Sequence, residues 1–480
     1  MKKLIYVLIG VVVAAVSSCS INTYNASLTD VDVARYRVPD SMTLVNDSST
    51  MASLLWQDYY SDYNLQCLID TAIARNLSLY NAMLQVDKAA TYVCQSNGSF
   101  FPNINLSLFQ DEIQASRNDG PYNLHGVSLG ITDWEIDLWG RLRNLKKSRV
   151  EALMKEQWAM QGVKVKLIAD VATLYYRLVG LDAKLHAVSE IIDLNQHYLD
   201  ELDGAHPHSS NHTDGSAYGS VVTSRHSVAV EQARAELFKA KAAKPRIENE
   251  IFVTENAINL LLARTEGEIE RVNIEKVVAT GNWNDTISVG VPVHLISYRP
   301  DVMAAENAVR EAFAIKDAAR AAMYPRLTIS GSIATEEGLY ARWTDFPSTV
   351  VYNLFAGLTQ PLFRKGELRQ DWRYKKITAN QKVADFQQTL LSACVEVSNT
   401  LASYNTNREV IANLAKRYEA LFNAYTYSRQ LYHSKRADYL DVLLAQNQLL
   451  NARFELSDAM TAYYTNRIAL YLALGGGAAL

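Results

Sequence analysis

Segments in which apolar and polar residues alternate occur as a pair in each half of the chain. The first pair begins around Ile104 and Val127, and the second begins around Leu327 and Tyr352. A period of two with one apolar face is the pattern of a β-strand. We therefore predict four strands, each about the length of a tilted membrane strand, at about 103–110, 125–137, 326–335 and 350–361.

Much longer stretches carry apolar residues three or four positions apart. One such stripe runs from Leu167 to Ile192, and a second runs from Phe386 to Tyr425. A sustained spacing near 3.5 residues indicates long helices that pack together as in a coiled coil. We predict long and return helices at about 140–203, 221–264, 366–432 and 437–473, and shorter helices before the strand pairs at about 62–97 and 298–322.

The same order of elements occurs twice: helix, strand, strand, long helix and return helix. This internal similarity predicts a duplicated structure. Proline occurs where helix and strand meet, at Pro102, Pro325 and Pro361, because it prevents one geometry from running into the other. The predicted domains are a lipoprotein signal peptide (1–18), a tether (19–61), a first repeat (62–280) and a second repeat (281–480).

Aromatic residues, among them Trp134 and Trp139, gather near the predicted joints between strands and helices. Tryptophan is enriched at the interface between lipid and water, so these side chains are candidates for an aromatic belt. Packing inside the joint is an equally good interpretation, because aromatic side chains suit both uses.

The N-terminus has the pattern of an export signal. Two lysines precede an apolar segment from Leu4 to Val16, which is too short for a standard membrane-spanning helix. Cys19 follows small residues, in the position of a cysteine that is lipidated and becomes the mature N-terminus. The alternative is an ordinary secretory signal that contains a cysteine. We expect a lipoprotein in which acyl chains on Cys19 anchor the chain without spanning the bilayer.

Four strands cannot close a barrel within one chain, and lipid tolerates no open sheet edge. The chain must therefore pool strands with further copies of itself. Two copies would give eight strands and a barrel filled by side chains, whereas three would give twelve strands and a wider lumen. Long helices of about 100 Å, at about 1.5 Å per residue, would continue such a barrel as a conduit across much of the periplasm.

Net charge and the absence of catalytic motifs in the sequence exclude further classes of function. The net charge of −4 gives no reason to expect a nucleic-acid partner. The sequence contains no phosphate-binding glycine loop, nucleophile elbow or zinc-protease motif, so we expect no catalytic residues, no cofactor and no enzyme. Energy for transport must then come from a partner.

The remaining cysteines and the histidines do not form a metal-ligand pattern. Cys67, Cys94 and Cys394 are odd in number and widely spaced, so we interpret them as small buried apolar residues. The turn after the first long helix is rich in histidine. We expect a solvated loop there rather than a metal site, because no usual ligand spacing is present; its histidines are His206, His208 and His212.

Six short motifs occur in order along the duplicated frame: WEIDLWGR at 134–141, RPDV at 299–302, YPRL at 324–327, QPLF at 360–363, LDVL at 440–443 and LGGG at 474–477. With them the chain resembles the outer-membrane factors of tripartite efflux systems, the TolC-like and OprM/NodT-type lipoprotein family. The resemblance implies a mainly α fold with transmembrane β-strands. It also implies a homotrimeric twelve-strand β-barrel continued by a periplasmic α-helical barrel, an inner-membrane pump, and a periplasmic adaptor that docks on the helical tips.

Asp441 matches the position that lines the closed periplasmic aperture in relatives. Three copies around an axis would form a carboxylate ring that attracts cations. The alternative is a solvated aspartate in the first turn of a helix, where it interacts favourably with the helix dipole. Asp438 is a second gate candidate, and Lys435 and Arg436 are candidates for pairing across the tip or for contact with the adaptor.

Two other classes of function are compatible with parts of the sequence. A lipid-anchored coiled-coil scaffold or adhesin would explain the helices and the lipidation signal, but not four strand-like segments at matching places in two repeats. Ducts for type I protein secretion and for metal efflux share the architecture of ducts for drug efflux. Resemblance favours a passive duct for small toxic molecules in the outer membrane, whose cargo is chosen by its pump.

Overall fold

The computed structural model describes residues 54–113, 122–204, 217–272, 299–337, 350–361, 363–434 and 436–477. The described chain forms two compact units. The strand unit lies within residues 89–153 and 305–387, and the helical unit lies within 54–88, 154–304 and 388–477. Each unit contains segments of both predicted repeats, and the duplication itself stays a prediction. Cys19, the histidine-rich turn and Lys435 lie outside the described residues.

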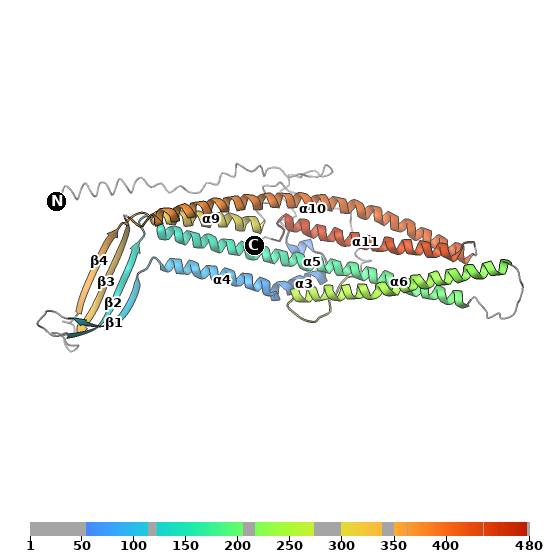
Figure 1. Ribbon diagram of the computed structural model, residues 1–480, viewed down its shortest axis with the longest axis horizontal. Coiled ribbons are helices and arrows are strands. Elements are labelled where there is room, and N and C mark those ends of the chain that lie inside the picture. Colours follow the sequence, from blue (N-terminus) through green and yellow to red (C-terminus); the bar gives the residue numbers. More distant parts are fainter. Residues whose placement is uncertain are drawn as a thin grey trace. The chain divides into compact units, whose positions relative to one another are not determined.

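The strand unit contains one four-stranded antiparallel sheet. Its strands lie side by side in chain order (Figure 1) and are β1 (Asn103–Ile113), β2 (Tyr122–Ile136), β3 (Arg326–Glu337) and β4 (Val350–Thr359). β1, β2 and β3 extend beyond the predicted bounds, because their pairing continues to Ile113, Tyr122 and Glu337. Among the described residues β1 and β4 are the two edges, and each has one side of its backbone without a neighbouring strand.

The register brings apolar residues of all four strands into rows across one face of the sheet. Leu106 lies opposite Leu129, Leu129 lies opposite Ile333, and Ile333 lies opposite Tyr352. These four side chains are between 51% and 81% exposed. A contiguous surface of large exposed apolar side chains is typical of a face that lipid or a partner covers.

The opposite face of the sheet is polar. Asn105 on β1 donates from Nδ2 to Thr132 Oγ1 on β2 at 2.9 Å. Asn353 on β4 donates from Nδ2 to Ser332 Oγ on β3 at 2.8 Å. Because side chains alternate along a strand, most apolar side chains lie on one face of the sheet and most polar ones on the other; Phe355, which shares the face of Asn353 and is 67% exposed, is an exception.

β2 contains a bulge that the alternating pattern does not reveal. Its pairing with β3 shifts between Ile131 and Trp134, and Asp133 between them has a φ of 47°. Positive φ is uncommon outside glycine, and aspartate tolerates it better than most residues. The backbone N–H of Asp133 donates to Ser330 Oγ at 3.1 Å, so the bulge is attached to β3.

Helices make up most of the described chain. None of those described combines the length and the hydropathy that a membrane-spanning helix needs. The long helices begin and end within four residues of the predicted bounds. The bounds are α2 (Trp56–Tyr59), α3 (Tyr63–Arg75), α4 (Leu77–Gly98), α5 (Arg141–Gly204), α6 (Ala217–Leu261), α9 (Pro300–Ala321), α10 (Glu367–His433) and α11 (Tyr439–Ala473).

The helix predicted at 62–97 is interrupted at Asn76, which separates α3 from α4. Asn76 has an extended backbone with a ψ of 123°. Its side chain accepts a hydrogen bond from the backbone N–H of Leu79 at 3.0 Å, as a helix N-cap does. The same side chain donates to the backbone oxygen of Leu261 at 2.9 Å, which ties the break to the end of α6.

We expect Asn76→Ala to lower the free energy of unfolding by about 2 kcal/mol. The N-cap and the buried hydrogen bond to Leu261 each contribute about 1 kcal/mol, and Asn76 is 8% exposed. Denaturant unfolding of the purified protein measures the loss. Asn81→Ala is the matched control, because Asn81 is exposed inside α4 and its replacement should cost nothing. Equal losses in the two variants would contradict the capping role.

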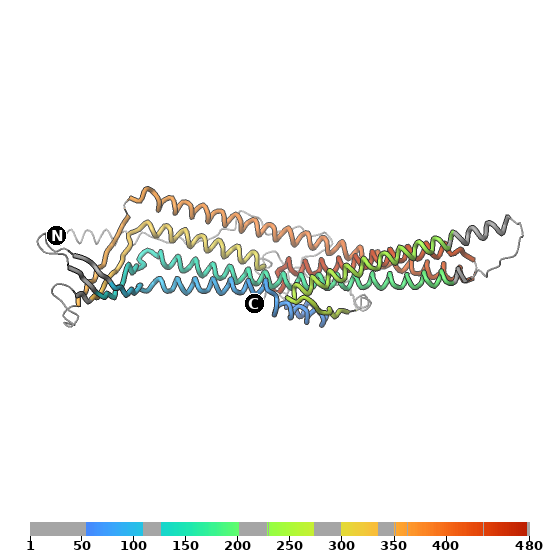
Figure 2. The backbone as a smooth tube through the Cα atoms, turned by 60° about the horizontal axis from the view of Figure 1, so that its bottom comes forward, coloured from blue at the N-terminus to red at the C-terminus, as the bar shows by residue number. Residues whose placement is uncertain are grey.

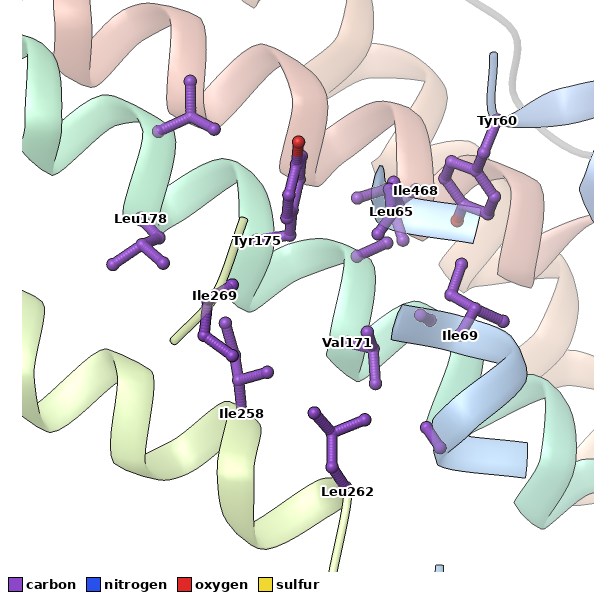
Figure 3. Packing of buried hydrophobic residues seen from close by; sticks show 14 of the residues in the cluster. Tyr60, Leu65, Ile69, Val171, Tyr175, Leu178, Ile258, Leu262, Ile269 and Ile468 are labelled. Carbon is purple, nitrogen blue, oxygen red and sulfur yellow. The ribbon is translucent and has the colours of Figure 1, made fainter. Parts of the chain in front are cut away.

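The core of the helical unit joins segments far apart in the sequence. Figure 3 shows Ile69 of α3, Val171 of α5 and Ile258 of α6 converging, and each is 0% exposed. Trp56 and Tyr60 belong to the same core and are 5% and 3% exposed. The prediction of an irregular tether up to residue 61 is therefore wrong at its C-terminal end, because large aromatic side chains gain most from burial.

The cysteines are not the buried residues that the sequence predicted. Cys67 and Cys94 are exposed, and Cys394 is partly exposed. Leu65 and Ile69 form the buried face of α3 at 0% exposure, and Cys67 lies midway between them in sequence. A residue two positions from a buried neighbour falls on the opposite side of a helix, so its position along the helix decides its burial.

Candidate functional site

The tips of the long helices gather an aromatic cluster. Figure 2 shows α5, α6 and α11 running side by side there. The ring centroid of Tyr439, the first residue of α11, lies 5.4 Å from that of Tyr198 on α5 and 5.7 Å from that of Tyr432 on α10. Tyr439 is 4% exposed, and burial raises its pKa above the ordinary value. These contacts hold the first turn of α11 against its neighbours.

Asp438 and Asp441, the predicted gate residues, lie on the solvent side of this first turn. Asp438 is the N-cap residue of α11, and among the described residues its side chain makes no capping bond. Asp441 is exposed, and its backbone N–H donates to Asp438 O at 3.1 Å. The next residue, Val442, is 0% exposed. Asp441 therefore lies away from the packed face of its own chain.

A buried amide pair lies behind Asp441. Gln446 on α11 donates from Nε2 to Asn195 Oδ1 on α5 at 2.8 Å, and the two residues are 4% and 1% exposed. One polar pair in an apolar seam fixes the register of two helices, because a slip would leave both amides unpaired. Our sequence analysis missed this pair, whose only signal is an amide residue on the apolar face of each helix.

Of the two basic residues predicted at the tip, the structure describes Arg436. Arg436 is exposed, and its backbone N–H donates to Leu431 O at 2.9 Å. Lys435 and the lipidation site Cys19 lie outside the described residues. In the part of the chain that is described, no group of three or more His, Cys, Asp or Glu side chains is placed to hold a metal ion.

The predicted tryptophans of the strand–helix joint are held by hydrogen bonds. Trp134 donates from Nε1 to Phe100 O at 2.9 Å, and Trp139 donates from Nε1 to Pro325 O at 2.7 Å. Trp139 also stacks on Tyr324, with ring centroids 5.1 Å apart. Both residues remain partly exposed, so these contacts agree with packing in the joint and with a place at the lipid interface. The predicted joint prolines flank the strands, with Pro102 before β1, Pro325 before β3 and Pro361 after β4.

Two ion pairs connect the end of β2 to the start of α5. Arg141 donates from Nε and Nη2 to Glu135 at 2.8 and 2.7 Å, and these bonds raise the pKa of its guanidinium. Arg143 donates from its backbone N and from Nε to Asp137 Oδ2 at 2.9 and 3.2 Å. Asp137 thereby caps the first turn of α5. Glu135, Asp137 and Arg141 lie within the motif at 134–141, and Arg143 lies two residues beyond it. The sequence alone does not show which of these charges are paired.

Arg299 organises a charged cluster in the helical unit. Its guanidinium donates to Asp301 at 3.0 and 2.8 Å, to Glu396 on α10 at 2.7 Å, and to the backbone oxygen of Ala473 at the end of α11 at 2.8 Å. Burial alone lowers the pKa of this guanidinium, but the two carboxylates outweigh burial, so its pKa lies above the ordinary value. One side chain thus links three segments of the unit.

A sheet with an exposed apolar face and two open edges, together with long helices, is the set of elements expected of an outer-membrane channel protein. The family model described as outer membrane efflux protein matches residues 68–201 and 291–476, which is well over half of the chain. The chain belongs to this family.

Curated relatives match along nearly the whole chain. The cation efflux system protein CusC of Escherichia coli (strain K12) is 25% identical over 440 residues, covering 90% of this chain and 91% of the relative. The solvent efflux pump outer membrane protein SrpC of Pseudomonas putida is 25% identical over 441 residues, covering 88% and 87%. The probable outer membrane lipoprotein SilC of Salmonella typhimurium is 25% identical over 453 residues, covering 92% and 93%.

Solved structures share the fold. A crystal structure of CusC aligns with a TM-score of 0.77 at 23% identity, covering 92% of this chain and 100% of that one. The open state of the MtrE outer membrane channel of Neisseria gonorrhoeae aligns with a TM-score of 0.76 at 22% identity, covering 92% and 98%. The chain is thus an outer-membrane efflux protein with the fold of these channels.

Proposed function

We propose that three copies of this chain form a passive export duct, with a twelve-strand barrel in the outer membrane and a tunnel of long helices in the periplasm. Acyl chains on Cys19 anchor each copy. An inner-membrane pump supplies small toxic molecules through an adaptor that docks on the helical tip. The observation that carries the proposal is the single sheet with one apolar face, one polar face and two open edges.

The two faces of the sheet suit lipid on one side and water on the other. The row from Leu106 to Tyr352 is apolar and exposed, and such side chains are stable against hydrocarbon. The opposite face carries Asn105, Ser332 and Asn353, whose amide and hydroxyl groups suit an aqueous lumen. A periplasmic scaffold that conducts nothing has no use for this segregation.

The two open edges require further copies of the chain. Unpaired backbone groups cost several kcal/mol each in hydrocarbon, so β1 of one copy must pair with β4 of the next until the ring closes. Two copies form an eight-strand barrel whose interior is filled by side chains. Three copies leave a passage, which supports a trimer for a chain that conducts.

Asp441 is the gate residue in this proposal. It lies on the exposed side of α11, and Leu444, one turn further along the same side, is 61% exposed. Around a threefold axis this side lines the narrow end of the tunnel, with Asp438 beside it. Lys435 and Arg436 hold the tip shut through ion pairs with neighbouring helices. Each exposed ion pair contributes less than about 1 kcal/mol, so an adaptor that binds the tip can separate them.

The channel does not choose the cargo. A relative named for cation efflux and a relative named for solvent efflux are each 25% identical to this chain. Selection of the exported molecule therefore belongs to the inner-membrane pump, and the duct accepts what its aperture admits.

Asp441→Ala is expected to lower the cation preference of the channel at least about fivefold. One carboxylate about 4 Å from a monovalent cation in water contributes about 1 kcal/mol, which corresponds to this factor, and in the trimer the substitution removes one carboxylate from each copy. Single-channel recording in planar bilayers, with unequal salt on the two sides, measures the preference through the reversal potential. Glu419→Ala is the matched control, because it removes one exposed carboxylate of α10 outside the tip cluster.

The same recordings separate the duct from the gate. If the variant Asp441→Ala and the wild type have channels of the same selectivity, the duct is supported and the role of Asp441 as the gate is overturned. A folded preparation that sediments as a monomer and lacks barrel signal in circular dichroism overturns the duct, and supports a lipid-anchored scaffold instead.

A further inference from the structure

A pocket of about 410 Å³ opens in the strand unit where β2 ends and β3 begins. Its volume lies within the range of small-molecule sites. Trp139 and Tyr324, stacked on each other, form part of the wall. The charged wall consists of two carboxylates and three guanidinium groups, from Glu135, Asp137, Arg141, Arg326 and Arg364.

Some of these charges satisfy one another. Both oxygens of Glu135 accept hydrogen bonds from Arg141, at 2.8 and 2.7 Å. The Nη1 atom of Arg326 lies 3.7 Å from Glu135 Oε2, and the side chain of Arg326 remains 54% exposed. Glu135 is therefore already paired within the chain, whereas Arg326 keeps exposed donors.

Asp137 is the group that points to a ligand. Its side chain is only 6% exposed, and its Oδ2 accepts from Arg143. Its Oδ1 is buried, and among the described residues no donor reaches it. A buried carboxylate oxygen without a donor is costly, so such atoms in folded proteins usually have a partner. Asp137 lines the pocket, so a small movement of the joint brings Oδ1 within reach of a donor that enters from outside.

Arg364 supplies the complementary group. It lines the same pocket, five residues after the end of β4, and it is exposed. Guanidinium groups bind phosphate through paired N–H donors. The pocket thus presents a carboxylate acceptor and exposed guanidinium donors within one small volume, which fits a ligand with an ammonium group and a phosphate group.

We propose that this pocket binds the head group of a membrane phospholipid with a primary ammonium, whose N–H groups donate to Asp137 Oδ1 while Arg326 and Arg364 bind its phosphate. The proposal rests on the proposed function, because a barrel in the membrane puts the strand ends at the level of the head groups. Tryptophan and tyrosine are enriched at that level. The lipid joins the ends of β2, β3 and β4 to the start of α5.

The test compares lipids that share acyl chains and differ in head group. The full-length protein is stripped of lipid in detergent and loaded with equal amounts of phosphatidylethanolamine, phosphatidylcholine and phosphatidylglycerol. Native mass spectrometry then counts the retained lipids. We expect the ethanolamine lipid to be retained about tenfold over the other two, which is the effect of one charge-assisted hydrogen bond. Choline has no N–H donor, and glycerol carries no positive charge.

Two variants test the two ends of the head group. Asp137→Asn keeps the size of the side chain and an acceptor for Arg143, and should abolish the preference for ethanolamine. Arg364→Gln leaves the Glu135 pairs intact and should lower retention of all three lipids about tenfold. The matched controls are Asp371→Asn and Arg369→Gln, exposed residues of α10 outside the pocket, which should retain lipid as the wild type does.

Each remaining outcome contradicts the proposal. Equal retention of the ethanolamine and choline lipids, or an Asp137→Asn variant with the wild-type preference, removes the ammonium contact. Displacement of the lipid by millimolar inorganic phosphate identifies a site for free anions instead. Conductance of the same preparations separates the two proposals: channels without head-group preference overturn only the lipid site, and head-group preference without channels overturns only the duct.

Discussion

Arg299→Ala is expected to lower the stability of the helical unit by about 3 kcal/mol. The Arg299 guanidinium is the shared donor to Asp301, Glu396 and the last turn of α11, and its side chain is 11% exposed. Loss of one partner from a buried ion pair costs about 3–5 kcal/mol. The lower end applies here, because Asp301 and Glu396 are 50% and 45% exposed and keep part of their hydration.

Hydrogen exchange at the end of α11 measures this loss as a lower free energy of local opening. Arg299→Lys keeps the charge but not the planar set of donors, so we expect an intermediate loss of about 1–2 kcal/mol. Arg310→Ala is the control, since it breaks only an exposed pair with Glu306 one turn away on α9 and should cost below about 1 kcal/mol. Similar exchange in the two alanine variants would contradict the linking role of Arg299.

Gly180→Leu is expected to cost about 3 kcal/mol or more, because α5 and α11 are in contact at this glycine. Ser457 on α11 donates from Oγ to Gly180 O at 2.8 Å, and Ser457 is 5% exposed. A Cβ atom at position 180 would overlap the hydroxyl of Thr461. A leucine side chain must therefore push α11 away from α5, and overpacking of this size costs about 1–3 kcal/mol before the hydrogen bond is lost as well.

A double-mutant cycle identifies the contact that is responsible. Gly180→Ala gains about 1 kcal/mol of helix propensity, which offsets part of the overlap with Thr461. Thr461→Ala removes the overlapping hydroxyl, so the double variant should be more stable than the sum of the two single changes by about 1 kcal/mol. Additive effects in denaturant unfolding would show that the helices are not in close contact at this point.

Strands and long helices were predictable because their signals are local. Alternation along Ile104 to Leu108 shows one apolar face within a few residues, and the prolines at 102, 325 and 361 mark the joints. The helix pattern also extends across Pro245, which lies inside α6 in the structure. An exposed proline there removes one backbone hydrogen bond and does not end the helix.

Features that depend on distant partners were not predictable. The side chain of Asn76 caps α4 locally through Leu79, but it also reaches Leu261, 185 residues away in the sequence. Arg299 reaches Ala473 across 174 residues, and Gln446 reaches Asn195 across 251. No pattern in a single sequence encodes such a pairing.

The candidate site also contains both predictable and unpredictable features. The position of Asp441 in the first turn of a helix followed from the sequence, and its exposure agrees with both the gate and a solvated aspartate. The unpartnered oxygen of Asp137 emerged only when the donors around it were known. Its neighbours at the joint were recognised as a motif, but the motif alone does not say which of its charges are already paired.

The open edges at β1 and β4 have a genetic consequence in the proposed trimer. A copy that folds but carries a blocked edge still enters the ring, and the barrel then fails for its two sound partners as well. When altered and normal chains are made in equal amounts and mix at random, only about one eighth of the trimers contain three normal chains. Lesions at an edge strand are therefore dominant, whereas lesions that prevent a chain from folding never reach the ring and are recessive.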